Sequence, residues 1–217
     1  MTLELTDNIK KQYGIIQSAK SIKDYVKTAF DIFTGTNSEL SEVIQFDEFW
    51  INQILIHILP GCRFEELISS FGRRDEIKGF VKRYNFKGYV FIREDCLVNV
   101  MQVIGHEIGH LMSRRLTDMV NEEAKAYAFK IAWCNIIQNN RIAGLGKEIM
   151  KMPIPSYDIE HYSAFKFVTK RIKEGYSPRN LFEDFITGKE QVRGICSIPL
   201  IFPNDIFFTL FIFSVSS

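Results

Sequence analysis

Residues 103–112 read VIGHEIGHLM, and this run decides how the chain is organised. It contains no proline and, with its histidines neutral, no charged residue except Glu107, so the pattern predicts an uninterrupted, largely buried helix. His106 and His110 are four residues apart and therefore lie one above the other on one face of that helix. Glu107 lies beside them. Two imidazoles and an adjacent carboxylate are the groups that a hydrolytic zinc site uses.

A glycine precedes each histidine of this run. Gly105 and Gly109 each cost roughly 1 kcal/mol of helix propensity relative to alanine, so we interpret them as points where a neighbouring element packs closely. The chain has four histidines, and two of them fall at the required spacing around a glutamate. This concentration favours a metal site over two unrelated surface histidines.

A catalytic zinc site normally has three protein ligands and one open position, so a third ligand is expected from a neighbouring element. Thr117 or Asp118 can cap a second helix that begins shortly after the first one ends. If the chain reverses near residues 116–117, His110 and Glu123 lie about six residues on either side of the turn, or roughly 9 Å from it. Both Glu122 and Glu123 could then reach the metal. We favour Glu123, because the small residues Ala124 and Ala126 beside it would let the two helices approach.

These two helices resemble a known family. Residues 103–112 resemble the extended signature of the zincin metallopeptidases, and residues 123–128 (EAKAYA) resemble the glutamate–alanine helix of the ImmA/IrrE-type gluzincins. The resemblance covers about residues 79–133. It implies a zincin-like fold in which His106, His110 and Glu123 bind Zn²⁺ and Glu107 is the catalytic general base.

The chain departs from the family pattern in two places. Many gluzincins have an aspartate four residues after the third ligand, where this chain has Tyr127, so an acid that orients a histidine must come from elsewhere. The helix-turn-helix domain that often accompanies ImmA/IrrE proteins is not evident. This second departure weakens any transfer of their regulatory role.

The expected fold class is α+β, with a mainly helical, zincin-like core and a small sheet or hairpin beside the motif helix. Residues 76–84 and 89–93 are rich in β-formers and flank the turn residues 85–88, which predicts a hairpin. Asp95 is the expected cap of the motif helix. Residues 89–93 are either the strand that lines the cleft and pairs with an extended substrate, or part of an ordinary hairpin that covers the helix pair.

Three regions are expected to form one compact unit: an N-terminal helical region (1–75), the metal-binding core (76–150) and a C-terminal helical region (151–217). In the first region, we predict helices over 5–33, 38–59 and 63–71. In the last, we predict helices over 160–174 and 179–187. His161 opens the first of these two, and we consider it either an oxyanion-stabilising residue or a surface histidine. His57 is expected to be a core or surface histidine and not a ligand.

Residues 195–215 are strongly apolar, but prolines and polar residues interrupt them. The uninterrupted stretch, 206–215, is about half of the roughly 20 residues that a membrane-spanning helix requires. We interpret the segment as buried strands or a docked tail, with a membrane-associated end as the alternative.

Composition excludes several classes of function. Of 217 residues, 46% are hydrophobic and 24% charged, which is typical of a globular protein with a sizeable core. A formal net charge of +1 gives no reason to expect a nucleic acid or an anionic membrane as partner. The four cysteines are widely spaced and no signal-peptide pattern is present, so a cytoplasmic location is expected.

The sequence therefore predicts a zinc-dependent metallohydrolase, most plausibly a metallopeptidase that acts on a peptide or protein substrate. The alternative is a non-catalytic regulatory or binding protein with a structural metal site. Neither the specificity nor the oligomeric state follows from the residues.

Overall fold

The protein is described by a computed structural model that covers residues 2–5, 19–35, 54–69, 77–85, 87–155 and 158–192. In chain order the elements are β1 (Thr2–Leu5), α2 (Ala19–Gly35), β2 (Ile54–Leu59), α5 (Gly61–Ile68), β3 (Gly79–Tyr84), β4 (Lys87–Arg93), α6 (Leu97–Leu111), α7 (Met119–Asn140), the 3₁₀ turns η2 (Ile142–Gly144) and η3 (Lys147–Met150), α8 (Ile159–Lys173) and α9 (Pro178–Thr187). This architecture confirms the prediction of a mainly helical α+β fold.

The four strands form one mixed sheet in the order β1-β2-β4-β3. β1, β2 and β4 are parallel, whereas β3 runs antiparallel to β4 as the first strand of the predicted hairpin. Isoleucines alternate with half-buried residues along β2, and Ile56 and Ile58 are fully buried. One face of the sheet therefore belongs to the core, because successive side chains of a strand point to opposite faces.

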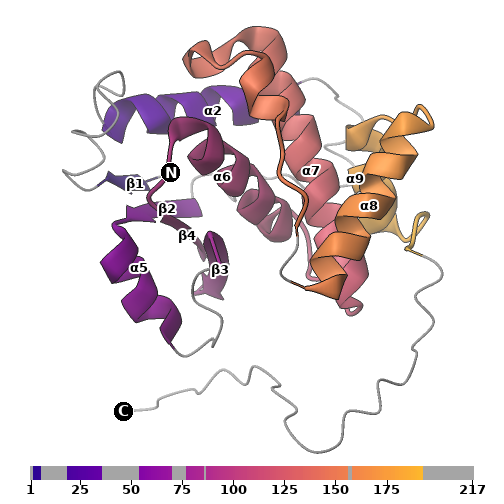
Figure 1. Ribbon diagram of the computed structural model, residues 1–217, viewed down its shortest axis with the longest axis horizontal. Coiled ribbons are helices and arrows are strands. Elements are labelled where there is room, and N and C mark those ends of the chain that lie inside the picture. The colour runs from indigo at the N-terminus through magenta and orange to yellow at the C-terminus, as the bar shows by residue number, and fades with distance from the viewer. Residues whose placement is uncertain are drawn as a thin grey trace, which may run out of the picture.

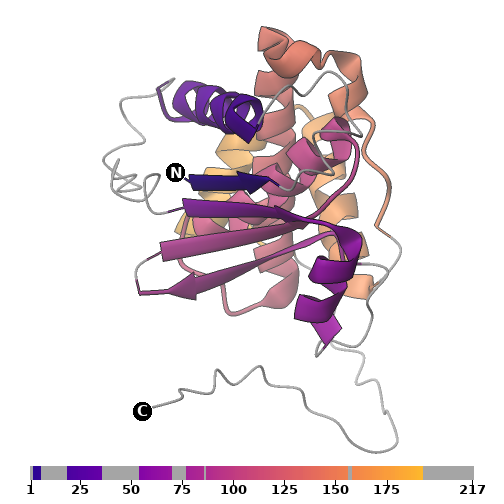
Figure 2. The same ribbon diagram turned by 90° about the vertical axis from the view of Figure 1, so that its left-hand side faces the viewer.

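Helices α6, α7, α8 and α9 are stacked in layers on one side of the sheet. α6 lies against β3 and β4, α7 packs along α6, and α8 and α9 cover the far side of α7 (Figure 1). The view turned by 90° shows α2 beyond the β1 edge and α5 at the ends of the strands (Figure 2). α7 is thus enclosed by neighbours, and every residue from Glu122 to Phe129 is buried.

The two glycines of the motif run let α6 and α7 approach closely. A Cβ atom added at Gly109 would lie 3.0 Å from the Cα atom of Ala126 and 3.0 Å from the Cβ atom of Phe129. One added at Gly105 would lie 2.5 Å from the ring of Trp133. The prediction that something packs against the motif helix at these glycines is confirmed, and Ala126 is the small residue on the opposite side of the contact.

Several local predictions are confirmed. Asp118 caps α7, because its Oδ1 accepts a hydrogen bond from the backbone N–H of Asn121 at 2.8 Å. The hairpin turn lies at Asn85, which has a positive φ of 48°. The helices predicted over 63–71, 160–174 and 179–187 correspond to α5, α8 and α9, within a few residues at their ends and as far as the described residues extend.

Other local predictions are wrong. Residues 54–59, predicted as the end of a helix, form strand β2, because their β-branched side chains pair with β4 in a buried parallel ladder. Leu5 belongs to β1 and not to a helix. Asp95 is not the N-cap of α6: Cys96 occupies that position, and Asp95 accepts the backbone N–H of Cys96 at 2.7 Å.

Residues 89–93 cannot be the strand that pairs with a substrate. They belong to β4, which is hydrogen-bonded to β2 on one side and to β3 on the other, so its backbone groups are already used. The sheet edge next to α6 is β3 instead.

Within the described residues, no helix is long and apolar enough to cross a membrane. The remainder of the helix predicted over 38–59 and the apolar segment 195–215 lie outside the described residues.

Candidate metal centre

His106, His110 and Glu123 converge on one point between α6 and α7. The two Nε2 atoms are 3.3 Å apart, and the Oε2 atom of Glu123 lies 3.2 Å from His106 Nε2 and 3.7 Å from His110 Nε2. The antiparallel return of α7 thus brings Glu123 level with His110, as the distances counted from the turn predict. These three residues also form the one group of potential metal ligands in the described part of the chain.

The three distances fit the donor spacing of a zinc ion. Four ligands at the tetrahedral corners of a Zn²⁺ ion, with bonds of about 2.0–2.1 Å, are about 3.3–3.4 Å apart. Glu123 Oε2 is buried at ion-pair distance from three imidazoles, those of His106, His110 and His161, yet it makes no hydrogen bond of good geometry within the described residues. A buried carboxylate oxygen in this state is costly unless a cation binds there. The residues therefore fit a divalent metal.

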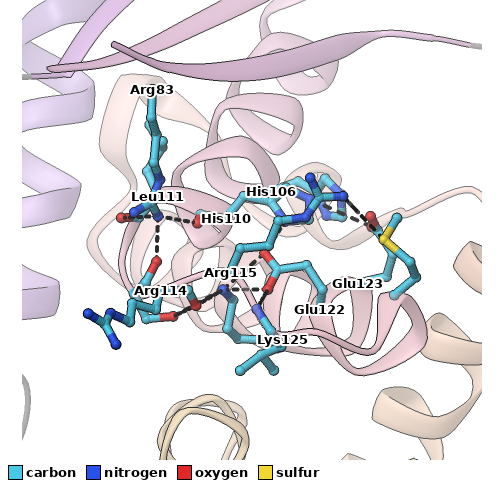
Figure 3. A network of polar contacts seen from close by, with 12 residues as sticks. Arg83, His106, His110, Leu111, Arg114, Arg115, Glu122, Glu123 and Lys125 are labelled. Atoms are coloured by element: carbon cyan, nitrogen blue, oxygen red, sulfur yellow. Dashed lines mark hydrogen bonds and ion pairs between the residues drawn. The ribbon is translucent and has the colours of Figure 1, made fainter. Parts of the chain in front are cut away.

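Glu122 binds Nδ1 of His110, whereas Nε2 of the same ring faces His106 and Glu123. His110 Nδ1–H donates to Glu122 Oε1 at 2.8 Å, so the remaining lone pair of the imidazole lies on Nε2 (Figure 3). Glu122 Oε2 also accepts the backbone N–H of Leu116 at 2.7 Å. Of the two glutamates that could reach the site, Glu123 lies among the ligand atoms and Glu122 orients a histidine.

Two cations hold the turn between α6 and α7 in place (Figure 3). Lys125 is fully buried, and its Nζ donates to both carboxylate oxygens of Glu122 at 2.9–3.0 Å and to Ser113 Oγ at 3.0 Å. The Arg83 guanidinium donates to the carbonyl groups of His110, Leu111 and Ser113 at the C-terminal end of α6. These bonds satisfy carbonyls that a helix end leaves without partners, and they fix the position of His110.

The surroundings set the protonation of the ligand group. Burial lowers the pKa of His106 to about 3, so this imidazole is neutral and able to bind a cation. Burial alone would raise the pKa of Glu123, but its contact with His106 and the charges of the nearby imidazoles lower that pKa to about 2. Burial also opposes the charged form of His110, yet the hydrogen bond to Glu122 raises its pKa overall.

Glu107 has a different environment from Glu122 and Glu123. Only 6% of the residue is exposed, and burial raises the pKa of its carboxyl group to about 7. The first residue of β3 packs against it: a Cβ atom at Gly79 would lie 3.1 Å from Glu107 Oε1. A carboxyl group whose pKa lies near neutrality can both accept and return a proton, which a general acid–base residue must do.

Tyr127 and His161 complete the site from α7 and α8. His161 Nδ1 lies 3.1 Å from Glu123 Oε2 and 3.2 Å from the hydroxyl oxygen of Tyr127. The position of His161 is fixed by Asp158, the α8 N-cap, which accepts the backbone N–H of His161 at 2.7 Å. Tyr127, at the position of the family's aspartate, packs its ring 4.6 Å from the ring of His106.

These residues face a cavity of about 400 Å³ that His106, Glu107, Tyr127 and His161 line. Its other walls come from the start of β3, from the N-terminal half of α6 and from residues 153–155. Gln102 fixes the segment before residue 153, because its amide donates to the carbonyl groups of Ile149 and Lys151 at 2.8 and 3.3 Å. The site is therefore open to a ligand of small-molecule or peptide size.

His57 and Cys96 lie outside this group of residues. His57 points to the opposite face of the sheet from the buried isoleucines of β2 and stacks on Phe91, with ring centroids 5.0 Å apart. Cys96 is exposed at the start of α6 and belongs to no ligand group of the described residues. The roles of Glu122, Lys125 and Arg83 at the turn between α6 and α7 were not predicted from the sequence.

Comparisons with protein-family models, with curated proteins and with solved structures found no match.

Proposed function

We propose that this protein is a zinc-dependent metallohydrolase, most plausibly a metallopeptidase with a gluzincin-like ligand set. One observation carries the proposal: three ligand atoms from two helices lie at tetrahedral donor spacing, beside a buried carboxyl group that faces the same cavity. Among the described residues, no fourth histidine, cysteine, aspartate or glutamate joins this group. A catalytic site needs such an open position, whereas a structural zinc site is closed by a fourth protein ligand.

A Zn²⁺ ion bound by His106, His110 and Glu123 would act as a Lewis acid and lower the pKa of water in its open position from about 15.7 toward about 7. Glu107 accepts a proton from the attacking water and later delivers it to the leaving amine. The burial that raises its pKa to about 7 suits this double role. The imidazole of His106 is neutral, and Glu122 holds the Nδ1–H of His110, so Nε2 is the nitrogen that His110 can offer to the ion.

His161 and Tyr127 are placed to stabilise the developing negative charge on the substrate oxygen. His161 Nδ1 lies 3.2 Å from the hydroxyl oxygen of Tyr127, and both residues line the cavity next to the ligand group. In a water-poor site, one hydrogen bond that an imidazole or phenol donates to an oxyanion stabilises the transition state by about 3 kcal/mol. Of the two sequence interpretations of His161, this position favours the oxyanion role over that of a surface histidine.

An extended peptide would pair with β3. This strand forms the edge of the described sheet, and its first residue, Gly79, lies both in the cavity wall and against Glu107. Main-chain hydrogen bonds to an edge strand would hold a peptide across the site largely independently of its sequence.

The test combines metal content with cleavage of a peptide library. Wild-type protein should bind about one zinc per chain and cleave peptides. Glu107→Gln should retain zinc and lose turnover by at least about 100-fold, the usual contribution of a general base. His106→Ala should lose both. Loss of zinc together with activity in Glu107→Gln would contradict its assigned role, and a zinc-loaded wild type that cleaves no peptide would refute the peptidase proposal.

A further inference from the structure

Two lysines of α7 have lost solvent contact to different degrees, Lys125 being fully buried and Lys130 half-buried, and they differ in their partners. Lys125 donates to Glu122 and Ser113 and is satisfied. Lys130 lies in the cavity wall. Within the described residues its Nζ makes no hydrogen bond or ion pair. It lies over the face of Tyr127, with 5.9 Å between Nζ and the ring centroid. Burial lowers its pKa, as expected of an ammonium that is withdrawn from water without a counter-charge.

The position of Lys130 relates it to the site. It follows Glu123 by seven residues, or two helical turns, and therefore lies on the same face of α7, about 10 Å further along the axis. Gly105 packs opposite Trp133 and Gly109 opposite Ala126, so Lys130 lies level with the part of α6 between these two contacts. His106 and Glu107 belong to that part of α6, and both line the cavity together with Lys130. Lys130 is thus a cation in the cavity wall close to Glu107.

An ammonium that has lost part of its hydration is stabilised by an anion or by several acceptors. Glu107 is close enough to raise the pKa of Lys130, but the two form no ion pair. The partner is therefore expected from the ligand, and its complementary chemistry is a carboxylate.

Resting on the proposed peptidase function, we propose that Lys130 is a specificity residue that selects peptides with a carboxylate next to the scissile bond. The carboxylate has two possible sources, an aspartate or glutamate side chain and the C-terminus of the peptide. Both would accept a charge-assisted hydrogen bond from Lys130 Nζ.

The test measures binding rather than turnover. Four pools of fluorescein-labelled hexapeptides carry either Glu or Gln at each of the middle positions, and each is made with a free or an amidated C-terminus. Their binding to the Glu107→Gln protein, which does not consume them, is followed by fluorescence polarisation. Zinc content is measured on the same samples, so a missing metal is detected separately from a missing carboxylate preference, and the peptide-library cleavage assay of the wild type reports a missing activity.

We expect the pools with a carboxylate to bind about tenfold or more tightly than the fully amidated Gln pool, in line with a hydrogen bond to a charged group. A preference for Glu over Gln identifies the side chain, and a preference for acid over amide identifies the C-terminus. Adding Lys130→Met, which keeps the volume and removes the charge, should abolish the preference, whereas Lys130→Arg should keep it. The matched control is Lys78→Met, because Lys78 is an exposed lysine at the same cavity, where solvent screens its charge, and its loss should leave the carboxylate preference in place.

Equal binding of all four pools, no binding of any pool, or a preference that survives Lys130→Met in a folded protein would overturn the proposal. Thermal melting of each variant establishes that it is folded.

Discussion

Replacing Glu122 with glutamine separates two roles that this carboxylate has in the structure. It orients the metal-facing nitrogen of His110, and it neutralises the fully buried Lys125. An amide retains only one oxygen. Either His110 Nδ1–H or the backbone N–H of Leu116 would then face an NH₂ group, and Lys125 would lose its counter-charge.

The magnitudes of the two effects differ. Removing one partner of a buried ion pair costs about 3–5 kcal/mol, and the bond from Lys125 to Ser113 Oγ places this case at the lower end, near 3. Loss of the carboxylate that orients a ligating histidine lowers metal affinity by about 10–100-fold. The double variant Glu122→Gln/Lys125→Met should regain most of the stability, because it leaves no buried charge unpaired, and it should still bind zinc weakly.

Urea unfolding of the metal-free proteins measures the first effect, and competition with a chelator of known zinc affinity measures the second. Lys125→Met alone is the control: Glu122 keeps its bonds to His110 and Leu116, so zinc affinity should stay within about threefold of the wild type. If Glu122→Gln binds zinc as tightly as the wild type, or if the double variant regains full affinity, then Glu122 does not orient a metal ligand.

Two further predictions concern packing. Gly109→Ala places a methyl group 3.0 Å from the backbone of Ala126, so overpacking should lower the free energy of urea unfolding by about 1–3 kcal/mol despite the better helix propensity. The control is Gly35→Ala, which has no described atom within 4 Å of the added methyl group and should be neutral or stabilising. Equal effects at both positions would show that α6 and α7 are not in tight contact. Burial raises the pKa of Cys134 to about 12, so mass spectrometry after brief iodoacetamide treatment at pH 8 should find Cys134 unmodified until urea is added and the exposed Cys62 modified at once. Rapid native labelling of Cys134 would contradict its place in the core.

The helical parts of the fold follow from local patterns, whereas the sheet depends on contacts that are distant in sequence. α6 and α7 were predictable because apolar spacing, an Asp118 cap and two small-residue positions all indicate the same antiparallel pair. Strand β2 was not, because a short apolar run such as residues 54–59 is compatible with either a buried helix or a buried strand. Its pairing with β1 and β4 decides between them, and that pairing spans about 50 residues on one side and about 30 on the other.

The ligand group was predictable for a similar reason. The positions of His106 and His110 are fixed by the geometry of one helix, and that of Glu123 by one short turn. The choice between Glu122 and Glu123 needed the rotation of α7 about its axis, which Gly109 and Ala126 determine only when the two helices are docked. The sequence shows Lys130 as a charged residue seven positions after Glu123 on a helix of small and aromatic residues. Only the packed structure shows that it has no hydrogen-bond or ion-pair partner among the residues that the structure describes.

Zinc stoichiometry in the presence and absence of Glu123 tests the metal centre most directly. Equilibrium dialysis of metal-free protein against zinc, read by atomic emission, should give about one tightly bound ion per wild-type chain and a large loss of affinity in Glu123→Ala, with the fold retained. A wild-type protein that binds no zinc, or a Glu123→Ala variant that binds it with unchanged affinity, would contradict the convergence of His106, His110 and Glu123 on a single cation.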